Sequence, residues 1–410
     1  MDTLFDDDHR LIREAVRDFL GAECTPARIR AAQARPDRID RELWQAFCEL
    51  GWAGLCLSED RGGQGLPLVY LGIMFEELGR HAAPLPAHGA LTGALLLDRV
   101  SKMPERLAEI IAGKHVLSLG LSDMGEGGAR AGCGTLTAAT DGEDIVLDGV
   151  VRFVDGAAAA DSVLASFRLD GDPALAVVDL SSPGIETRPF LTTSKDAQAE
   201  VAFANVRLPS GQLIARGAEA EALIAATEDL AVALNVSLMA GGARRTMEFA
   251  AEYAKERKAF GHPIGAFQAI QHLFANMLNA VDGTELLVHE AIWRMDQGLP
   301  CRTEVSQAKS FGNERCVFVC RSAQQIHGGI GFMDEFDLHL WYRNVVAWSL
   351  RWGSAMEHRE RIAAAVIDGP DRVRLDRGTD ANQQPPAGPQ AVYALAALPG
   401  PAAAAALVNA

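Results

Sequence analysis

The spacing of hydrophobic residues changes twice along this 410-residue chain, and these changes limit the possible folds more than any other feature. From residue 4 to about residue 113, apolar side chains recur every three or four positions, which is typical of helices. From about residue 114 to residue 211 the spacing falls to two and β-branched residues become common, which indicates strands. Helical spacing returns from about residue 218 to residue 365. We therefore predict an α+β protein with domains at residues 1–113, 114–213 and 214–368.

Composition excludes several classes of function. The net charge of −16 argues against nucleic acid as a ligand, because neutralising phosphates requires a basic face. The seven cysteines include no CxxC pair, so we expect neither a disulfide framework nor a metal site, and Cys316 and Cys320 read as buried packing residues of one helix. The acidic N-terminus lacks an apolar secretion signal, so we expect a cytoplasmic protein.

Three local patterns give further predictions. Asp148-Gly149 lies between two apolar runs and predicts the tight turn of a β-hairpin. Glu76 and Glu77 read as the solvated face of a helix without a chemical role. Residues 369–410 are rich in Pro, Gly and Ala and have no periodicity, so we predict a disordered tail that is too interrupted to span a bilayer.

Two segments of the third region contain residues that could bind a ligand. Residues 253–268 read YAKERKAFGHPIGAFQ, and we expect the helix to stop at Phe260-Gly261 with Arg257 in its last turn, where a guanidinium can bind a pyrophosphate. Residues 324–332 read QQIHGGIGF, in which closely spaced glycines let the backbone approach a ligand. Since the chain is acidic, any anion must be bound by a local basic cluster, and we assign this role to Arg244, Arg245, Lys255, Arg257 and Lys258.

Together the two segments resemble the FAD-dependent acyl-CoA dehydrogenase family, and the likeness covers about residues 4–368. The resemblance implies an N-terminal helical domain, a small middle β-barrel and a C-terminal four-helix bundle. In that family the two segments hold the FAD of a neighbouring subunit. By that resemblance the FAD contacts would be Arg257, Phe260, Gln268, Gln325, Gly328 and Gly329.

The segments that face the flavin in the family depart from its pattern here. The family's T-E-P-x-x-G-S-D loop corresponds to residues 122–129, in which Ser122 keeps a hydroxyl. The family's Trp-Ile-Thr strand reads Phe153-Val154-Asp155, so Phe153 can lie against the ring, whereas Asp155 brings a carboxylate to it. A carboxylate there opposes the anionic reduced flavin by several kcal/mol unless it is protonated or turned away. We expect FAD binding, with flavin reduction less favoured.

The catalytic base of the family is missing from both positions where its members carry it. These positions fall on Ala231 and Trp352, and neither residue is acidic. Glu228, one helical turn before Ala231, is a weak substitute, because one turn displaces it by about 5 Å. The family's CoA-contacting Asp corresponds to Asp229, which is also compatible with a solvated helix carboxylate, whereas the neighbouring Arg is replaced by Val232.

Three hypotheses follow from this pattern. The preferred one is an acyl-CoA dehydrogenase family subunit that lacks the catalytic Glu and completes the FAD site of a paralogous partner in a heterotetramer. The segment from Gly328 to Leu340 resembles family members that degrade bulky acyl-CoAs, several of which are such heterotetramers. The alternatives are a self-sufficient dehydrogenase, as a homo-oligomer with Glu228 as displaced base, and a non-redox thioester-binding or scaffold protein. By resemblance the substrate would be an acyl-CoA and the acceptor an electron-transfer flavoprotein.

Overall fold

The computed structural model describes residues 6–123 and 133–368. The N-terminal region is helical, as predicted. Asp6 and Thr25 cap the first two helices by accepting hydrogen bonds from backbone N–H groups of the first turn. The helices and 3-10 turns of this region are α1 (Asp7–Glu23), α2 (Pro26–Gln33), α3 (Arg41–Glu49), η1 (Trp52–Gly54), η2 (Glu59–Arg61), α4 (Leu68–Arg80), α5 (Ala87–Arg99) and α6 (Pro104–Ile111).

The middle region is one sheet of eight strands in the order β6-β7-β3-β2-β4-β5-β8, with β1 parallel to β4. Its apolar core includes Leu147, Phe167 and Val201. The predicted all-β region is confirmed, and the outer strands β6 and β8 do not pair with each other within the described sheet. The strands are β1 (Leu117–Leu121), β2 (Leu136–Asp141), β3 (Asp144–Val154), β4 (Ser162–Leu169), β5 (Asp172–Asp179), β6 (Ile185–Pro189), β7 (Ala199–Pro209) and β8 (Leu213–Arg216).

The hairpin turn lies elsewhere than predicted. The chain turns at Gly142, between β2 and β3, whereas Asp148-Gly149 lies inside β3. Gly149 has φ 134° at a shift of register, and a Cβ there would lie 2.3 Å from the Thr135 carbonyl oxygen. An Asp-Gly pair therefore marks a β-bulge here, because both a bulge and a tight turn accept the glycine conformation.

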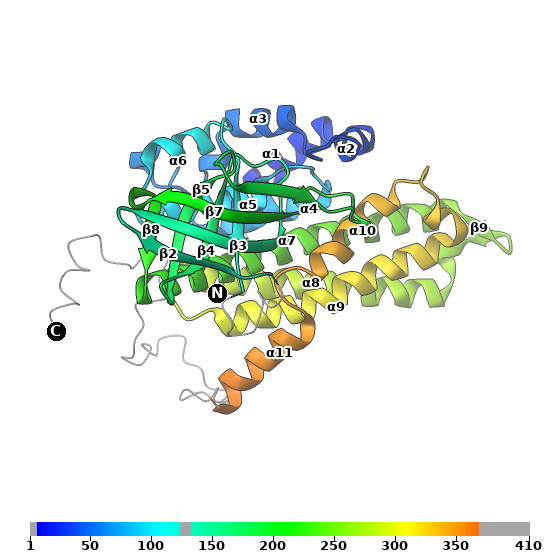
Figure 1. Ribbon diagram of the computed structural model, residues 1–410. Coiled ribbons are helices and arrows are strands. Elements are labelled where there is room, and N and C mark those ends of the chain that lie inside the picture. Colours follow the sequence, from blue (N-terminus) through cyan, green and yellow to red (C-terminus); the bar gives the residue numbers. More distant parts are fainter. Residues whose placement is uncertain (1–5, 124–132, 369–410) are drawn as a thin grey trace.

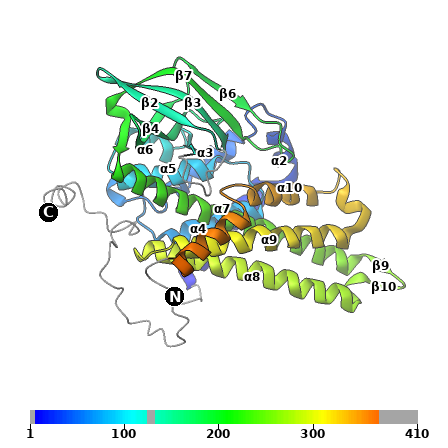
Figure 2. The ribbon, with the colours of Figure 1, turned by 60° about the horizontal axis from the view of Figure 1, so that its bottom comes forward.

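The C-terminal region is a bundle built on the long helix α7, and Figure 1 and Figure 2 show the sheet at one end of it. By length and composition α7 could cross a membrane, but 83% of its most apolar window is buried in the protein, as in the core helix of a globular domain. Cys316 and Cys320 are buried, as predicted. The elements are η3 (Ser210–Gln212), α7 (Ala218–Glu256), β9 (Lys258–Ala259), β10 (His262–Pro263), η4 (Ile264–Ala266), α8 (Gln268–Asp296), α9 (Arg302–His327), η5 (Gly328–Phe332), α10 (Leu338–Ser349), α11 (Ala355–Ala363) and the π-helical turn η6 (Ala364–Asp368).

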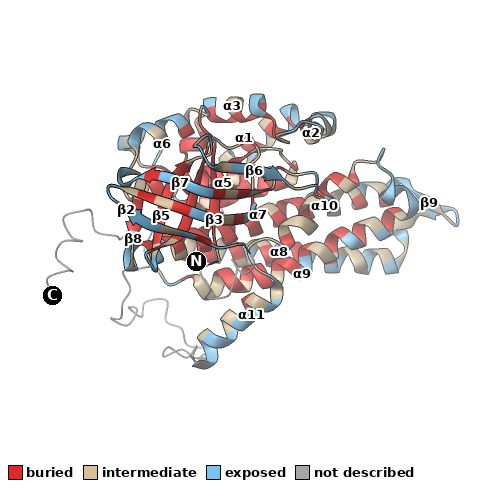
Figure 3. Cartoon of the chain, viewed as in Figure 1, coloured by how far each residue is buried: buried red, intermediate tan, exposed pale blue. Residues whose placement is uncertain are grey.

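Helix α4 crosses α7 at very short range and joins the N-terminal helices to the bundle. An added Cβ at Gly241 would lie 1.8 Å from the Glu76 carbonyl oxygen, so only glycine fits this crossing. Most of α4 is buried, and Figure 3 shows exposed residues at the far end of the bundle, around β9. The crossing fixes the position of α4, and with it the N-terminal helices, against the bundle.

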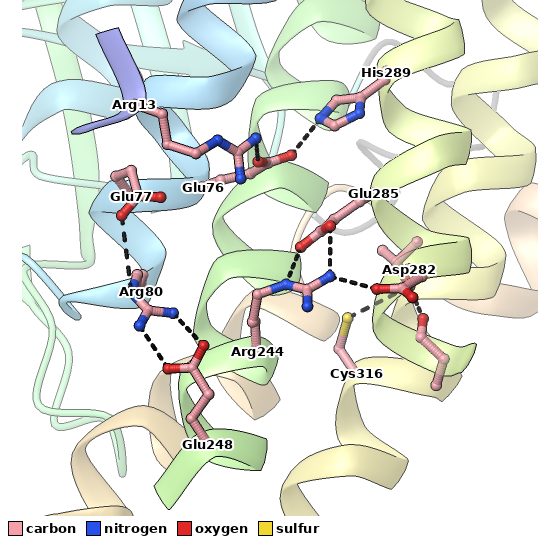
Figure 4. Close-up of polar contacts among 12 residues, drawn as sticks. Arg13, Glu76, Glu77, Arg80, Arg244, Glu248, Asp282, Glu285, His289 and Cys316 are labelled. Carbon is pink, nitrogen blue, oxygen red and sulfur yellow. Dashed lines mark hydrogen bonds and ion pairs between the residues drawn. The ribbon is translucent and has the colours of Figure 1, made fainter. Parts of the chain in front are cut away.

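The prediction that Glu76 and Glu77 form a solvated face was wrong. Both are buried at the α4–α7 crossing, where Glu76 accepts from Arg13 at 2.7 Å and contacts His289 Nε2 at 2.5 Å. Glu77 pairs with Arg17 of α1 at 2.7 Å. Figure 4 shows this network of charged side chains between α1, α4, α7 and α8. Buried carboxylates require such partners, and these partners lie on helices distant in sequence.

Candidate active site and cofactor clamp

The two glycine-containing segments of the sequence meet at one end of the bundle. The ring of Tyr253, in the last turn of α7, stacks on that of His327 at a centroid distance of 4.5 Å. His327 ends α9 and is followed directly by Gly328 and Gly329. The chain therefore brings both predicted segments together, on elements about 70 residues apart in sequence.

The helix ends earlier than predicted. α7 stops at Glu256, and Arg257 is extended, with φ −69° and ψ 123°. The next residues form the β9–β10 hairpin, in which Phe260 and Gly261 are the turn, with φ 51° and 83°. Gly261 is thus left-handed as expected, but it serves a hairpin rather than a helix end. Arg257 begins this hairpin and its carbonyl accepts from the Ile264 N–H at 2.8 Å.

This end of the bundle presents an open surface, which we call the clamp and define by Arg257, Phe260, Gln268, Gln325, Gly328 and Gly329. The side chains of Arg257, Gln268 and Gln325 are exposed, and Phe260 is 92% exposed. A Cβ added at Gly328 or Gly329 would meet nothing within 4 Å, so the backbone is accessible there. An exposed guanidinium and an accessible glycine backbone at the same end of the bundle fit the pyrophosphate of a dinucleotide.

The wider basic cluster predicted around Arg257 is not formed. Arg244 is engaged inside the bundle by Glu285 and Asp282, each at 2.6 Å, as Figure 4 shows. Arg245 pairs with Glu248 and Glu252. Helical periodicity points these two arginines toward acidic neighbours, which leaves Arg257, with the exposed Lys255 and Lys258, for an anion.

A second candidate site is a cavity of ≈ 780 Å³ between the sheet and the C-terminal helices. This volume lies within the usual range of about 300–1,000 Å³ for cofactor and ligand pockets. Its apolar wall includes Leu119 and Leu121 of β1, Phe153 of β3 and Trp352. Phe153 is half-exposed at φ 58°, which turns its ring toward Phe190 at a centroid distance of 5.5 Å.

Three of the residues that line this cavity carry a buried polar atom without a hydrogen-bond partner. These atoms are Asn313 Oδ1, Arg343 Nε and Trp352 Nε1, one acceptor and two donors among the lining residues. Because these atoms are buried, they do not reach into the cavity, and it is the volume and the apolar wall that suit a flat ring such as an isoalloxazine. Ser122 does not line this cavity, because it is fully buried and its hydroxyl donates to the Ser166 carbonyl at 2.6 Å. The rest of its loop, residues 124–129, lies outside the described residues.

Asp155 lies on the wall of the ≈ 780 Å³ cavity, and Arg351 compensates its charge. Arg351 Nη1 is 3.0 Å from Asp155 Oδ1, and Nη2 of the same side chain contacts Asp196. Burial raises the pKa of Asp155 to about 6, although Arg351 acts in the opposite direction. The carboxylate is therefore paired rather than free. The guanidinium weakens the repulsion that we expect between this carboxylate and an anionic reduced flavin.

The two positions where the family carries its base converge on one side chain, His88 of α5. His88 Nε2 donates to the Ala231 carbonyl at 2.9 Å, and the His88 ring lies 5.6 Å from the Trp352 ring. Because Nε2 carries the proton, Nδ1 is the acceptor, and burial lowers the pKa of His88 to about 4. The slot between the two positions thus holds a neutral imidazole and an indole.

Glu228 and Asp229 do not line the ≈ 780 Å³ cavity. Glu228 is fully buried and accepts from Arg361 of α11 at 2.7 Å. Asp229 is buried beside Arg302 at 3.7 Å, and burial raises its pKa to about 7. Asp229 is therefore no solvated helix carboxylate, and the engagement of Glu228 with Arg361 speaks against the displaced-base alternative.

The carboxylates that do line the large cavity all have partners. Asp155 and Asp196 share Arg351, Glu314 pairs with Arg359 at 2.6 Å, and Glu357 accepts from the Ser354 N–H at 2.6 Å in a capping box. Among the described residues, this cavity therefore offers no carboxylate free to remove a proton.

Sequence reasoning missed His88, Asp196 and Arg351. These residues come from α5, the loop before β7 and the segment after α10, and only the fold brings them together. Sequence reasoning offered no signal for any of the three.

Residues 230–367 match the acyl-CoA dehydrogenase C-terminal domain, and residues 6–100 match the acyl-CoA dehydrogenase N-terminal domain. The chain belongs to the acyl-CoA dehydrogenase family. The members of this family are oxidoreductases that use FAD and act on acyl-CoA. A relative, the 3-(aryl)acrylate reductase of Clostridium sporogenes, is 28% identical over 389 residues, which cover 88% of this chain and 99% of the relative.

Solved structures of the family share the whole architecture. The Tcur3481-Tcur3483 steroid ACAD superimposes with a TM-score of 0.81 at 28% identity, covering 88% of this chain and 98% of that one. The ChsE4-ChsE5 complex from Mycobacterium tuberculosis superimposes with a TM-score of 0.83 at 23% identity, covering 90% of this chain and 100% of that one. The predicted fold class and family are confirmed, and some neighbours are heteromeric.

Proposed function

We propose that this acyl-CoA dehydrogenase family chain is the subunit without a catalytic base in a hetero-oligomer that dehydrogenates an acyl-CoA between Cα and Cβ. The observation that carries the proposal is the slot around His88, where the two base positions hold Ala231 and Trp352. Proton abstraction needs a base within hydrogen-bond reach of the substrate carbon. A neutral imidazole whose Nε2 is already bonded to the Ala231 carbonyl is a poor replacement for a carboxylate.

In this proposal the function of the subunit is to bind a cofactor through the clamp. FAD, when bound, supplies the hydride acceptor for the reaction. Arg257 would pair with its pyrophosphate, and Gly328 and Gly329 would let the backbone approach it. Figure 1 and Figure 2 show the β9–β10 hairpin at the end of the bundle away from the sheet, whereas Phe153 and Asp155 belong to the sheet side. The clamp of this chain would therefore hold the cofactor of a partner.

Two relatives support a heteromeric role. The neighbours include the ChsE4-ChsE5 complex and the Tcur3481-Tcur3483 steroid ACAD, whose names each give two components. We propose a paralogous dehydrogenase subunit as the partner, a bulky acyl-CoA as the substrate and an electron-transfer flavoprotein as the acceptor. We propose the cytoplasm as the location.

Co-expression with the paralogous subunit tests the proposal. We expect dehydrogenase activity and full flavin content only when both chains are present, and Arg257→Ala should lower the FAD retained by the assembled enzyme by tenfold or more. Arg10→Ala, which removes an exposed arginine of α1, is the matched control and should retain FAD. Unchanged FAD content in assembled Arg257→Ala enzyme would contradict the assignment of the clamp.

The same preparations separate the alternatives. Activity of this chain alone that disappears in Glu228→Gln would support the self-sufficient dehydrogenase. Colourless protein, both alone and with the paralogue, would support a non-redox scaffold. Activity that requires the partner and persists in Glu228→Gln supports the subunit without a base.

A further inference from the structure

A second, smaller cavity lies next to the large one, on the helical side of the sheet. It measures ≈ 110 Å³ and is lined by His88, Asn235 and Trp348 among others. This volume is below the range of about 300–1,000 Å³ that ligand pockets usually have. The large cavity can hold a ring system, whereas the small one cannot hold an acyl thioester as it stands.

The Arg351 bridge separates the two cavities. Asp155, Asp196 and Arg351 each line both of them, and the arginine bonds to both carboxylates. The three groups come from β3, the loop before β7 and the segment after α10, so they close the gap between sheet and bundle. Arg38 holds the loop from the other side, because its Nη1 donates to the carbonyls of Phe190 and Asp196 at 2.9 and 3.0 Å.

A ring pair completes the separation beside the bridge. Trp352 lines only the large cavity and His88 only the small one, with their ring centroids 5.6 Å apart. Trp352 is in the left-handed conformation at φ 59°, which is unfavourable for a bulky residue. An indole in that conformation implies that the surrounding structure holds it there.

Side chains of α9 and α11 hold this segment in place through hydrogen bonds. Lys309 Nζ donates to the Trp348 carbonyl at 2.9 Å, and Asn313 Nδ2 donates to the Gly353 carbonyl at 3.1 Å. His358 donates from Nε2 to the Trp352 carbonyl at 2.7 Å, while its Nδ1 lies 3.2 Å from the Ser306 hydroxyl. Ser306, Lys309 and Asn313 are buried and follow each other at helical spacing, so one face of α9 fixes the segment with Arg351 and Trp352.

We propose that the His88–Trp352 ring pair and the Arg351 bridge form a partition that keeps acyl-CoA thioesters out of this chain's own slot. The inference rests on the proposed function and deepens it. On this inference the chain lacks the catalytic base, and the partition also prevents the thioester from reaching the slot around His88, next to the ≈ 780 Å³ cavity. His88 and Trp352 are then specificity-determining residues, because they decide which subunit of the oligomer takes the thioester.

The test counts bound acyl-CoA in the assembled enzyme by equilibrium dialysis with butyryl-CoA. We expect the double variant Trp352→Gly/His88→Ala to bind one more butyryl-CoA per copy of this chain than the wild type. Glycine suits φ 59°, so this change removes the indole without straining the backbone. Ser101→Gly, at φ 56° in an exposed turn outside both cavities, is the matched control and should bind the wild-type number.

Two results would overturn the proposal. One is a wild-type enzyme that already binds one butyryl-CoA at every copy of both subunits, which needs no folded variant to be seen. The other is a folded double variant that binds no more butyryl-CoA than the Ser101→Gly control. The FAD content of assembled Arg257→Ala enzyme, measured beside these samples, shows whether the partition or the clamp has failed. Flavin that depends on Arg257 while wild-type slots bind thioester would refute the partition alone, and flavin independent of Arg257 would refute the clamp.

Discussion

Replacing Asp155 with Asn should flatten the pH dependence of stability. The pKa of this carboxyl is about 6 in the folded protein, against 3.8 for an unperturbed Asp. Between these values the folded state binds more protons than the unfolded state, so stability falls as pH rises. The ionised carboxylate therefore costs the fold about 1 kcal/mol near pH 4.5 and about 3 kcal/mol near pH 7.5, and the neutral Asn does not titrate.

Urea unfolding of wild-type and Asp155→Asn protein across this pH range measures the effect. The difference in free energy of unfolding between the two proteins should grow by about 2 kcal/mol from pH 4.5 to pH 7.5, in favour of the variant. Other titrating groups are common to both proteins and largely cancel in this difference. Asp60→Asn, which removes a carboxylate that is 78% exposed, should run parallel to the wild type and serves as control.

Parallel curves for Asp155→Asn and wild type would refute the reasoning. They would mean that Asp155 titrates near its usual value, so that Arg351 or water already compensates its burial in full. The bridge between the two cavities would then be an ordinary solvated ion pair, and its role as part of a closed partition would lose its physical basis.

Two further predictions concern the α4–α7 crossing. Glu76→Gln should lower the free energy of unfolding by about 3 kcal/mol, because Arg13 and His289 lose a buried partner, whereas Glu186→Gln at an exposed pair should cost less than about 1 kcal/mol. Gly241→Ala should cost about 3 kcal/mol, since its Cβ would meet the Glu76 carbonyl at 1.8 Å, whereas Gly211→Ala, with no atom within 4 Å, should stay within about 0.5 kcal/mol. The midpoint of urea unfolding measures both effects. Either prediction would be contradicted if the variant and its control lost the same free energy of unfolding.

The order of helical and β regions was predictable from the sequence because it depends on local spacing. Strands run from Leu117 to Arg216 and the long helix starts at Ala218, close to the changes of period. Exact turns were less predictable, because the same residue type serves several purposes. Gly149 and Gly261 have the positive φ that their context suggests, but one forms a bulge and the other a hairpin. The local sequence indicates that a glycine is needed at these positions, but it does not indicate whether the glycine forms a bulge or a hairpin turn.

The burial of charge could not be predicted, because it depends on partners far along the chain. Glu76 has the spacing of an exposed helix residue, and its partners Arg13 and His289 lie 63 and 213 residues away. Arg244 shows the same limit, since its acidic partners are on α8. Sequence motifs likewise predicted the clamp and the two vacant base positions, whereas the residue between those positions, His88, belongs to a helix with no motif.

The proposed arrangement would explain how a family member can lose its base and still be needed. The clamp and the ring cavity lie on different parts of one chain, so in the proposed oligomer each cofactor would require the clamp of one subunit and the cavity of another. On this proposal, Ala231 and Trp352 in place of a carboxylate would disable only the slot in the same chain, and the partition would keep substrate from that slot. Arg257 and Gly328 would act on the neighbour's cofactor, and their contribution would not depend on chemistry in their own subunit. A variant that opens the partition should therefore change how many thioesters bind while the flavin content stays the same, and a loss of flavin on opening would show that the two ends of the chain are coupled.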